Sequence, residues 1–242
     1  MASSYDAIVI GMGPGAIFFA YEMIQKNQNK KILLVEQGKR VEDRSCPIET
    51  IGKCVKCKPF CNITSGFSGA GAFSDGKYNI TNNFGGTLYE YIGKDTAIDL
   101  MKYVDEINLA YGGEGTKMYS TAGTKFKKLC LQNKLNLLDA SVRHLGTDIN
   151  YIVLENIYQE LKDKVEFRFF YPVSRLEMLE DGYRVFHEEE YDDCDKCIVS
   201  VGRSGSKWME SVCKDLEIPT KSNRVDLGAV SYTHLRAHET LS

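Results

Sequence analysis

The first 36 residues of this 242-residue chain predict an α/β fold with a parallel sheet. An apolar segment, Ala7–Ile10, leads into the turn GMGPGA at residues 11–16, and an amphipathic segment follows it. A second apolar segment, Ile32–Val35, ends at Glu36. Strand, glycine-rich turn, helix, strand and acid in this order are typical of a dinucleotide-binding βαβ unit, so we predict a Rossmann-like domain. A glycine turn in an unrelated α/β protein is the alternative.

Each residue type in the turn suits a nucleotide. Gly11 permits the tight turn, Gly13 lets the backbone approach a pyrophosphate, and Ala16 lets helix and strand pack closely. Pro14 lies in the first helical turn, where the missing N–H costs nothing and the remaining N–H groups face an anion. Glu36 follows Ala16 by 20 residues. A carboxylate at this position can accept hydrogen bonds from a ribose diol.

The composition is that of an ordinary soluble protein, with 43% hydrophobic and 26% charged residues. A net charge of −3 gives no argument for a nucleic acid or an anionic membrane, so we expect neither as a partner. The apolar run Ala16–Ala20 is too short to cross a bilayer and has no basic leader before it. Eight cysteines without a secretion signal indicate reduced thiols, and we expect a cytoplasmic protein.

Downstream segments predict further elements. Residues 65–83 are rich in glycine and should wrap closely around a ligand. Apolar periodicity predicts helices over 94–109, 125–135 and 150–162, with Asp148 capping the third. We expect strands at 137–142, 165–170 and 197–201, a hairpin (173–179 and 183–186) around Glu180-Asp181-Gly182, and a last helix over 207–216.

This order predicts a split domain. Residues 1–65 and 151–229 would form a three-layer Rossmann-like domain with a β-hairpin or meander. Residues 66–150 would form an inserted α+β region that covers the reactive end of the cofactor and faces the substrate.

Residues 230–240 read VSYTHLRAHET and resemble one reading frame of a sequencing adaptor. We therefore expect the natural sequence to end near Ala229 and residues 230–242 to be a non-native tail. A genuine polar C-terminal tail is the alternative. His234 and His238 lie in this tail and carry no functional expectation.

Four motifs together point to a family. They are GMGPG at 11–15 with EQG at 36–38, GFSGAGAFSDGK at 66–77, RHLGTD at 143–148, and IVSVGRSG at 198–205. Over about residues 5–229 the chain resembles bacterial FAD-dependent dehydrogenases of the glutathione-reductase-like superfamily, described broadly as NAD(P)/FAD-dependent oxidoreductases. GAGAFSDGK is the most specific of the four motifs. The C-terminal Gly-Asp motif of that family is absent from this chain.

The resemblance implies a cofactor site. The ADP part of FAD would lie on Gly11, Gly13, Gly15 and Glu36, and the small-residue motif after a later strand would contact the cofactor. The strand near Val173 would lie beside the adenine. The full predicted cofactor set is Gly11, Gly13, Pro14, Gly15, Ala16, Glu36, Gln37, Gly38, Gly71, Ala72, Ser74, Asp75, Val173, Ser200, Val201 and Gly202. For Ser74 and Asp75, closure of an Asp-Gly turn with Gly76 is the alternative.

Four cysteines form a separate cluster, with Cys46, Cys54, Cys57 and Cys61 spaced C-x7-C-x2-C-x3-C. Thiolates at such close spacing can converge on zinc or an iron–sulfur cluster. The C-x-x-C pair within the set could instead cycle between dithiol and disulfide and exchange electrons with a flavin. Four loop cysteines without a shared role are the third alternative.

Arg143 and His144 follow an apolar strand and precede a Gly-Thr-Asp turn. His144 could donate a proton beside a flavin, and Arg143 could hold an anionic substrate. A histidine that caps a turn is the alternative.

We therefore expect the N-terminal part of an FAD-dependent oxidoreductase that passes hydride or electrons through its flavin to or from a small-molecule substrate or redox partner. NAD(P)H is the candidate electron donor. An NAD(P)-only dehydrogenase and a non-catalytic flavin- or metal-binding module are the alternatives.

Overall fold

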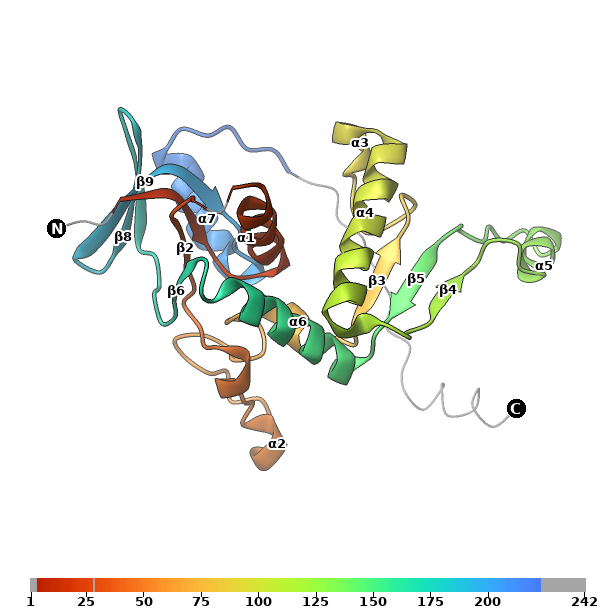
Figure 1. Ribbon diagram of the computed structural model, residues 1–242. Coiled ribbons are helices and arrows are strands. Elements are labelled where there is room, and N and C mark those ends of the chain that lie inside the picture. Colours follow the sequence, from red (N-terminus) through yellow and green to blue (C-terminus); the bar gives the residue numbers. More distant parts are fainter. Residues whose placement is uncertain (1–3, 28, 223–242) are drawn as a thin grey trace.

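The computed structural model describes residues 4–27 and 29–222, so the tail from residue 230 lies outside the described part (Figure 1). The main sheet has six strands in the order β6-β2-β1-β9-β8-β7. Their bounds are β1 Ser4–Ile10, β2 Ile32–Val35, β6 Glu166–Arg168, β7 Arg175–Leu179, β8 Gly182–His187 and β9 Glu190–Val199. Strands β6, β2, β1 and β9 are parallel neighbours, and β7 and β8 are antiparallel. The predicted α/β fold with a parallel sheet is confirmed.

Helices cover both faces of this sheet (Figure 1). Helix α1 (Pro14–Lys26) and helix α6 (Thr147–Leu161) share one buried cluster with Val9 and Leu34. Helix α7 (Ser206–Asp215) lies on the other face, where Val212 packs in a cluster with Ile8 and Leu33. Successive residues of β1 and β2 therefore point into different cores, which explains why these strands are continuous apolar runs.

Local signals predicted most elements to within a few residues. The hairpin is confirmed, with Leu179 opposite Gly182 and a φ of 135° at Gly182. A Cβ at Gly182 would lie 2.3 Å from the carbonyl oxygen of Cys194, so only glycine fits there.

The prediction that Asp148 caps helix α6 was wrong. Gly146 is the N-cap, and Asp148 lies inside the first turn without making a capping hydrogen bond.

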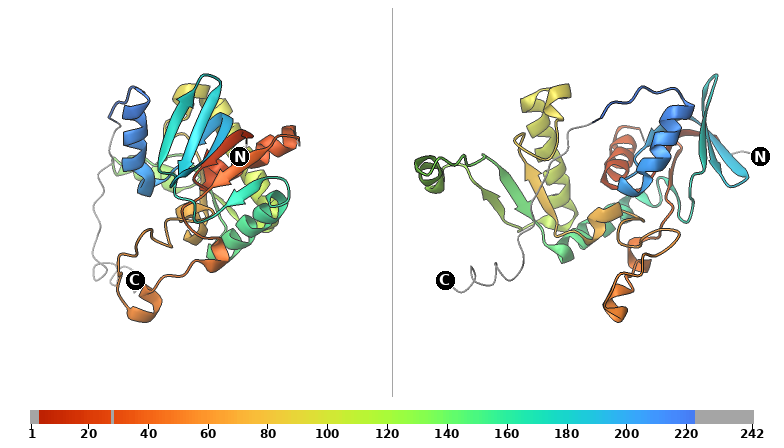
Figure 2. Two further views of the ribbon diagram at one scale, coloured as in Figure 1. Left: turned by 90° about the vertical axis from the view of Figure 1, so that its left-hand side faces the viewer. Right: turned by 180° about the vertical axis from the view of Figure 1, so that it is seen from behind.

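A second, three-stranded sheet lies beside the far end of α6 (Figures 1 and 2). Its order is β3-β5-β4, with β3 at Lys77–Ile80, β4 at Met118–Ser120 and β5 at Ser141–His144. The associated helices are α3 (Tyr89–Ile92), α4 (Lys94–Asn108) and α5 (Phe126–Gln132), and a π-helical turn, Leu109–Gly113, follows α4. A further short helix, α2 (Ile48–Ile51), lies in the cysteine-rich loop. Strand β3 was not predicted because glycine-rich sequence surrounds it.

A buried ion pair joins α4 to the second sheet. Arg143 on β5 donates two hydrogen bonds of 2.7 Å to the carboxylate of Asp105, one from Nε and one from Nη2. Its Nη1 donates a third to the carbonyl oxygen of Thr116 at 2.7 Å. The hydrogen bonds to Asp105 raise the pKa of Arg143 above its ordinary value. Both side chains are buried and each of the three guanidinium nitrogens donates one hydrogen bond, so this pair is part of the structure of the region.

No helix within the described residues has both the length and the apolar character needed to cross a lipid bilayer.

We predict that Asp105→Ala lowers the free energy of unfolding by about 3–5 kcal/mol, because it leaves the Arg143 guanidinium buried and without its carboxylate. The matched control is Asp99→Ala on the same helix. Asp99 pairs with Lys102 at the surface, so its loss should change the free energy by less than about 0.5 kcal/mol. Urea unfolding followed by circular dichroism measures both variants. Equal midpoints for the two variants would contradict the role given to the pair.

Candidate functional site

A cavity of about 700 Å³ opens where the carboxyl ends of β1, β2 and β9 meet. β1 has β2 on one side and β9 on the other, so this edge is the point where the strand order reverses. Open α/β sheets bind their ligands at such points. Eleven of the predicted cofactor residues line the cavity: Gly11, Gly13, Pro14, Gly15, Glu36, Gln37, Gly71, Val173, Ser200, Val201 and Gly202.

The glycine-rich turn shows why its residues are small. Gly11 has a φ of 92°, and a Cβ there would lie 2.6 Å from the carbonyl oxygen of Ser200. A Cβ at Gly15 would lie 3.0 Å from Ser200 Oγ. At Gly13 the nearest atom to a Cβ would be 4.0 Å away. Gly11 and Gly15 are therefore small because of protein contacts, whereas Gly13 leaves open space on the cavity side.

Two backbone donors in the turn are free. Among the described residues no acceptor pairs with the N–H of Gly13 or of Gly15, and Pro14 between them has none to offer. Both glycines line the cavity at the start of α1, where the helix dipole favours negative charge. The turn can therefore bind an anion through main-chain N–H groups.

The carboxylate of Glu36 is buried and accepts three hydrogen bonds from backbone N–H groups. Met12 donates to Oε2 at 3.0 Å, and Gly38 and Gly66 each donate to Oε1 at 2.9 Å. Glu36 thus joins the glycine-rich turn, the end of β2 and the start of the 66–77 motif. Each carboxylate oxygen accepts about two hydrogen bonds, so Oε2 keeps one position for a hydroxyl donor in the cavity.

Arg44, which the sequence did not single out, is the cationic counterpart of Glu36. Its buried guanidinium donates to the carbonyl oxygens of Asn62, Ile63, Phe67 and Gly69 at 2.6–2.8 Å. Burial lowers the pKa of Arg44 to about 10, while the nearby carboxylate of Glu36 acts in the opposite direction. At neutral pH the side chain stays charged and holds residues 62–69 as one wall of the cavity.

A second missed residue, Asn150 on α6, reaches the same wall from the opposite side. Its Nδ2 donates to the carbonyl oxygen of Gly71 at 2.9 Å, and its Oδ1 accepts a 3.1 Å hydrogen bond from the hydroxyl of Tyr78 on β3. Nearby, the N–H of Ser68 donates to the carbonyl oxygen of Met12 at 2.7 Å. Ser68 has a φ of 64°, and its buried Oγ has no hydrogen-bond partner among residues 4–27 and 29–222. The 66–73 segment is therefore tied to the glycine turn and to the second sheet.

Five predicted cofactor residues do not line the cavity. Ala16 and Ala72 are core residues, and Gly38 packs against the backbone at Gly66, where a Cβ would lie 2.5 Å from the amide nitrogen. Ser74 Oγ accepts a 3.2 Å hydrogen bond from the N–H of Gly76, and Asp75 pairs with Lys77 at 2.6 Å. The structure thus places Ser74 and Asp75 in the Asp-Gly turn, the alternative noted from the sequence.

Arg143 and His144 also lie outside the cavity. Arg143 forms the ion pair with Asp105, so the candidate catalytic role does not agree with its position. His144, next to it on β5, is exposed.

The four clustered cysteines are free thiols in the loop that carries α2. Cys46 and Cys57 are half-buried, and Cys54 and Cys61 are exposed. Within residues 4–27 and 29–222 no three histidine, cysteine, aspartate or glutamate side chains converge as metal ligands. The close spacing in sequence is therefore not matched by convergence in space, and the residues do not fit a zinc or iron–sulfur site in this arrangement. The alternative of a redox pair at Cys54 and Cys57 stays a prediction.

Several residues that line the cavity were not predicted. Tyr171 donates to Asp192 Oδ2 at 3.0 Å, and burial raises its pKa to about 12. Trp208 donates from Nε1 to the carbonyl oxygen of Ser174 at 3.1 Å. The side chain of Arg203 forms no ion pair or hydrogen bond within residues 4–27 and 29–222, and Thr64 and Ser65 also line the cavity. Of the five lining residues just named, Arg203 lies inside the motif IVSVGRSG and the other four lie outside the motifs.

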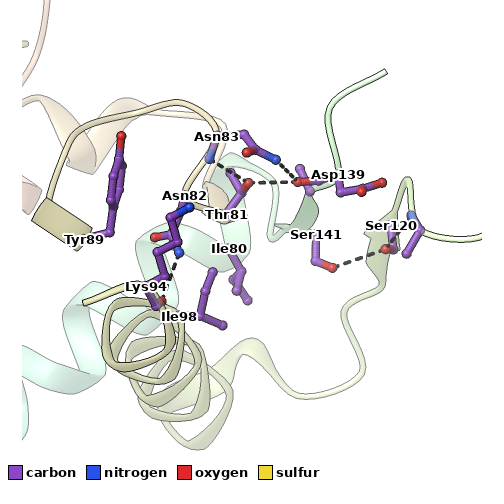
Figure 3. Close-up of a pocket in the computed structure, with 12 residues that line it drawn as sticks. Ile80, Thr81, Asn82, Asn83, Tyr89, Lys94, Ile98, Ser120, Asp139 and Ser141 are labelled. Atoms are coloured by element: carbon purple, nitrogen blue, oxygen red, sulfur yellow. Dashed lines mark hydrogen bonds between the residues drawn. The ribbon is translucent and has the colours of Figure 1, made fainter. Parts of the chain in front are cut away.

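A second cavity, of about 460 Å³, lies between α4 and the second sheet (Figure 3). Most of its polar groups pair with each other. The carbonyl oxygen of Asp139 accepts from Thr81 and Asn83 at 2.9 Å each, and Ser141 Oγ donates to Ser120 Oγ at 3.3 Å. These bonds connect the segments that follow β3 and precede β5. The cavity holds none of the predicted site residues, so we assign it to the architecture of the second sheet.

Sequence comparisons match this chain to no protein-family model and to no curated protein. Structure comparison matches it to glycine oxidase from Geobacillus kaustophilus with a TM-score of 0.51 and 12% identity, over 90% of this chain and 59% of that one. It also matches the amino acid oxidase NikD (0.47, 12%; 88% and 54%) and a thioredoxin reductase from Streptococcus pyogenes (0.36, 14%; 84% and 36%). The chain spans little more than half of the glycine oxidase and NikD chains. It shares the fold of the glycine oxidase.

We predict that Glu36→Gln destabilises the protein by about 1.5–3 kcal/mol, since a carboxamide turns its NH₂ toward one of three backbone donors and removes the charge that they share. Glu42→Gln is the matched control. Glu42 pairs with Arg40 at the surface, and its neutralisation should cost less than about 1 kcal/mol. Chemical unfolding measures the difference. A Glu36→Gln variant as stable as the control would show that the three bonds do not hold the loops.

Proposed function

We propose that this chain binds FAD in the 700 Å³ cavity and is part of a flavin-dependent oxidoreductase whose substrate is a small molecule. The observation that supports this most directly is the cradle of Gly11, Gly13 and Gly15, in which two main-chain N–H groups have no partner among the residues that the structure describes. The fold shared with a glycine oxidase supports an oxidoreductase. The resemblance of the 66–77 motif to FAD-dependent dehydrogenases favours a flavin over a nicotinamide as the resident cofactor.

The residues present fit the adenosine diphosphate part of the cofactor. The N–H groups of Gly13 and Gly15 would bind the pyrophosphate, and the free position on Glu36 Oε2 would accept from a ribose hydroxyl. Val173 and Tyr171 would give an apolar wall for the adenine. The guanidinium of Arg203, which pairs with no acid within the described part of the chain, would offset phosphate charge.

When bound, a flavin supplies hydride or electron transfer, and the protein binds and orients it. In this chain Arg44 holds residues 62–69 and Asn150 holds Gly71, so the two side chains fix one wall of the cavity from two sides. These two side chains are positioning residues, because neither lines the cavity.

We predict that Gly13→Glu abolishes FAD binding without unfolding the chain. The nearest atom to a new Cβ is 4.0 Å away, so the backbone tolerates the side chain, while its carboxylate competes with the pyrophosphate for the free N–H groups. FAD affinity should fall by roughly 100-fold or more, as expected when charge repulsion and lost hydrogen bonds add. Titration of flavin fluorescence and the visible spectrum of the purified protein measure it.

The control for Gly13→Glu is Gln25→Glu, which adds the same charge to the exposed end of α1. It should bind FAD as the unaltered protein does. A colourless protein that takes up NADH but neither FAD nor ADP would overturn the proposed function.

We predict that Arg203→Gln weakens FAD binding by about tenfold, because it removes the unpaired cation of the cavity wall. Lys207→Gln on the neighbouring α7 is the control and should have little effect, since Lys207 does not line the cavity. The loss should shrink at high salt if the interaction is electrostatic. Equal affinities for both variants would show that Arg203 does not contact the phosphates.

A further inference from the structure

The charge of this chain is unevenly distributed. Between Gly115 and Leu138 the sequence has five lysines and no aspartate or glutamate, although the whole chain has a net charge of −3. The same 24 residues contain a phenylalanine, a tyrosine and five leucines. We call residues 115–138 the basic arm.

The basic arm projects away from the rest of the molecule. It leaves the second sheet along β4, carries α5 at its tip and returns to β5, and two views show α5 at the extreme end (Figures 1 and 2). Helix α5 buries none of its side chains. Phe126 is 55% exposed, Leu129 53%, Leu131 64% and Leu135 62%. Phe126 and Leu129 are three residues apart and share one face of α5, and large apolar side chains this exposed indicate an interaction surface.

The lysines of the arm are largely free to meet an external charge. Lys127 pairs with Asp139 at 2.8 Å. Among the described residues Lys125, Lys128 and Lys134 have no acidic partner. Lysine and large apolar side chains are thus interspersed around α5 at the tip of the basic arm. A partner that binds this tip must combine negative charge with an apolar interior.

We propose that the basic arm docks the protein on the surface of an anionic phospholipid bilayer. Phe126 and Leu129, which share one face of α5, would enter the boundary between head groups and acyl chains, and the lysines would lie at the level of the phosphates. A bilayer suits a convex tip, whereas a folded protein partner would need a matching groove. A nucleic acid would leave the leucines in water. Docking is independent of the cofactor in the main cavity.

The test is sedimentation of the whole chain with vesicles of phosphatidylcholine and phosphatidylserine, compared with vesicles of phosphatidylcholine alone. We expect binding to the anionic vesicles that weakens as salt is added. The triple variant Lys125→Gln, Lys128→Gln, Lys134→Gln should lose roughly 100-fold in affinity. The control Lys53→Gln, Lys56→Gln, Lys58→Gln removes the same charge from the cysteine-rich loop and should keep most of the binding.

A second variant reports insertion directly. The fluorescence of Phe126→Trp should shift to shorter wavelength on anionic vesicles, which places the side chain in an apolar environment. Absence of sedimentation with anionic vesicles would overturn the proposal, as would equal losses in the two triple variants. Light scattering that shows a dimer, abolished by Leu131→Gln, would assign the arm to a second copy of the chain and would also overturn it.

Discussion

The carboxylate of Glu36 is the constraint on which the candidate site depends. A buried charge is tolerated only when hydrogen bonds replace its water, and here three backbone N–H groups from three separate segments do so. The positions of Met12, Gly38 and Gly66 are fixed relative to one another as a result. Arg44 is the corresponding buried cation, and its guanidinium donates hydrogen bonds to four carbonyl oxygens of residues 62–69. The two charges give a fixed shape to a segment that has few side chains to pack.

This arrangement explains why glycines near the cavity have different roles. Gly38 and Gly66 approach each other so closely that a Cβ at Gly38 would lie 2.5 Å from the Gly66 nitrogen, and neither lines the cavity. They are small so that both N–H groups can reach Glu36. A Cβ at Gly13 would have its nearest protein contact at 4.0 Å, so ligand access is the simplest reason for the size of this residue. A glycine-rich motif therefore combines residues needed for packing with residues needed for the ligand.

The first βαβ unit and the hairpin were predictable because their signals are local, such as the apolar runs, Gly11, Pro14 and the Asp-Gly turn. Eleven of the sixteen predicted cofactor residues line the cavity: those of the first βαβ unit follow from these local signals, and the others follow from the resemblance to a family. Arg44 and Asn150 could not be found this way, because each acts on backbone groups that a distant part of the chain supplies.

The cysteine cluster is the opposite case, in which the sequence suggests a metal site that the described residues do not form. Its spacing is suggestive, but the fold does not bring three of those thiols together among the described residues. Ser74 and Asp75 have polar side chains that Gly76 and Lys77 satisfy locally, whereas Arg143 is paired with Asp105 from another element.

The net charge of the whole sequence likewise differs from the local charge on one part of its surface. A net charge of −3 describes the average field at a distance, where positive and negative groups cancel. The basic arm contains no acid, and Asp139, which follows it in the sequence, already pairs with Lys127. Salt at physiological strength screens exposed charges beyond about 8 Å, so a ligand at the tip responds to the local lysines and hardly to the distant acids. The sign of a whole chain therefore says little about a projecting segment, and the partner of such a segment must be argued from its own residues.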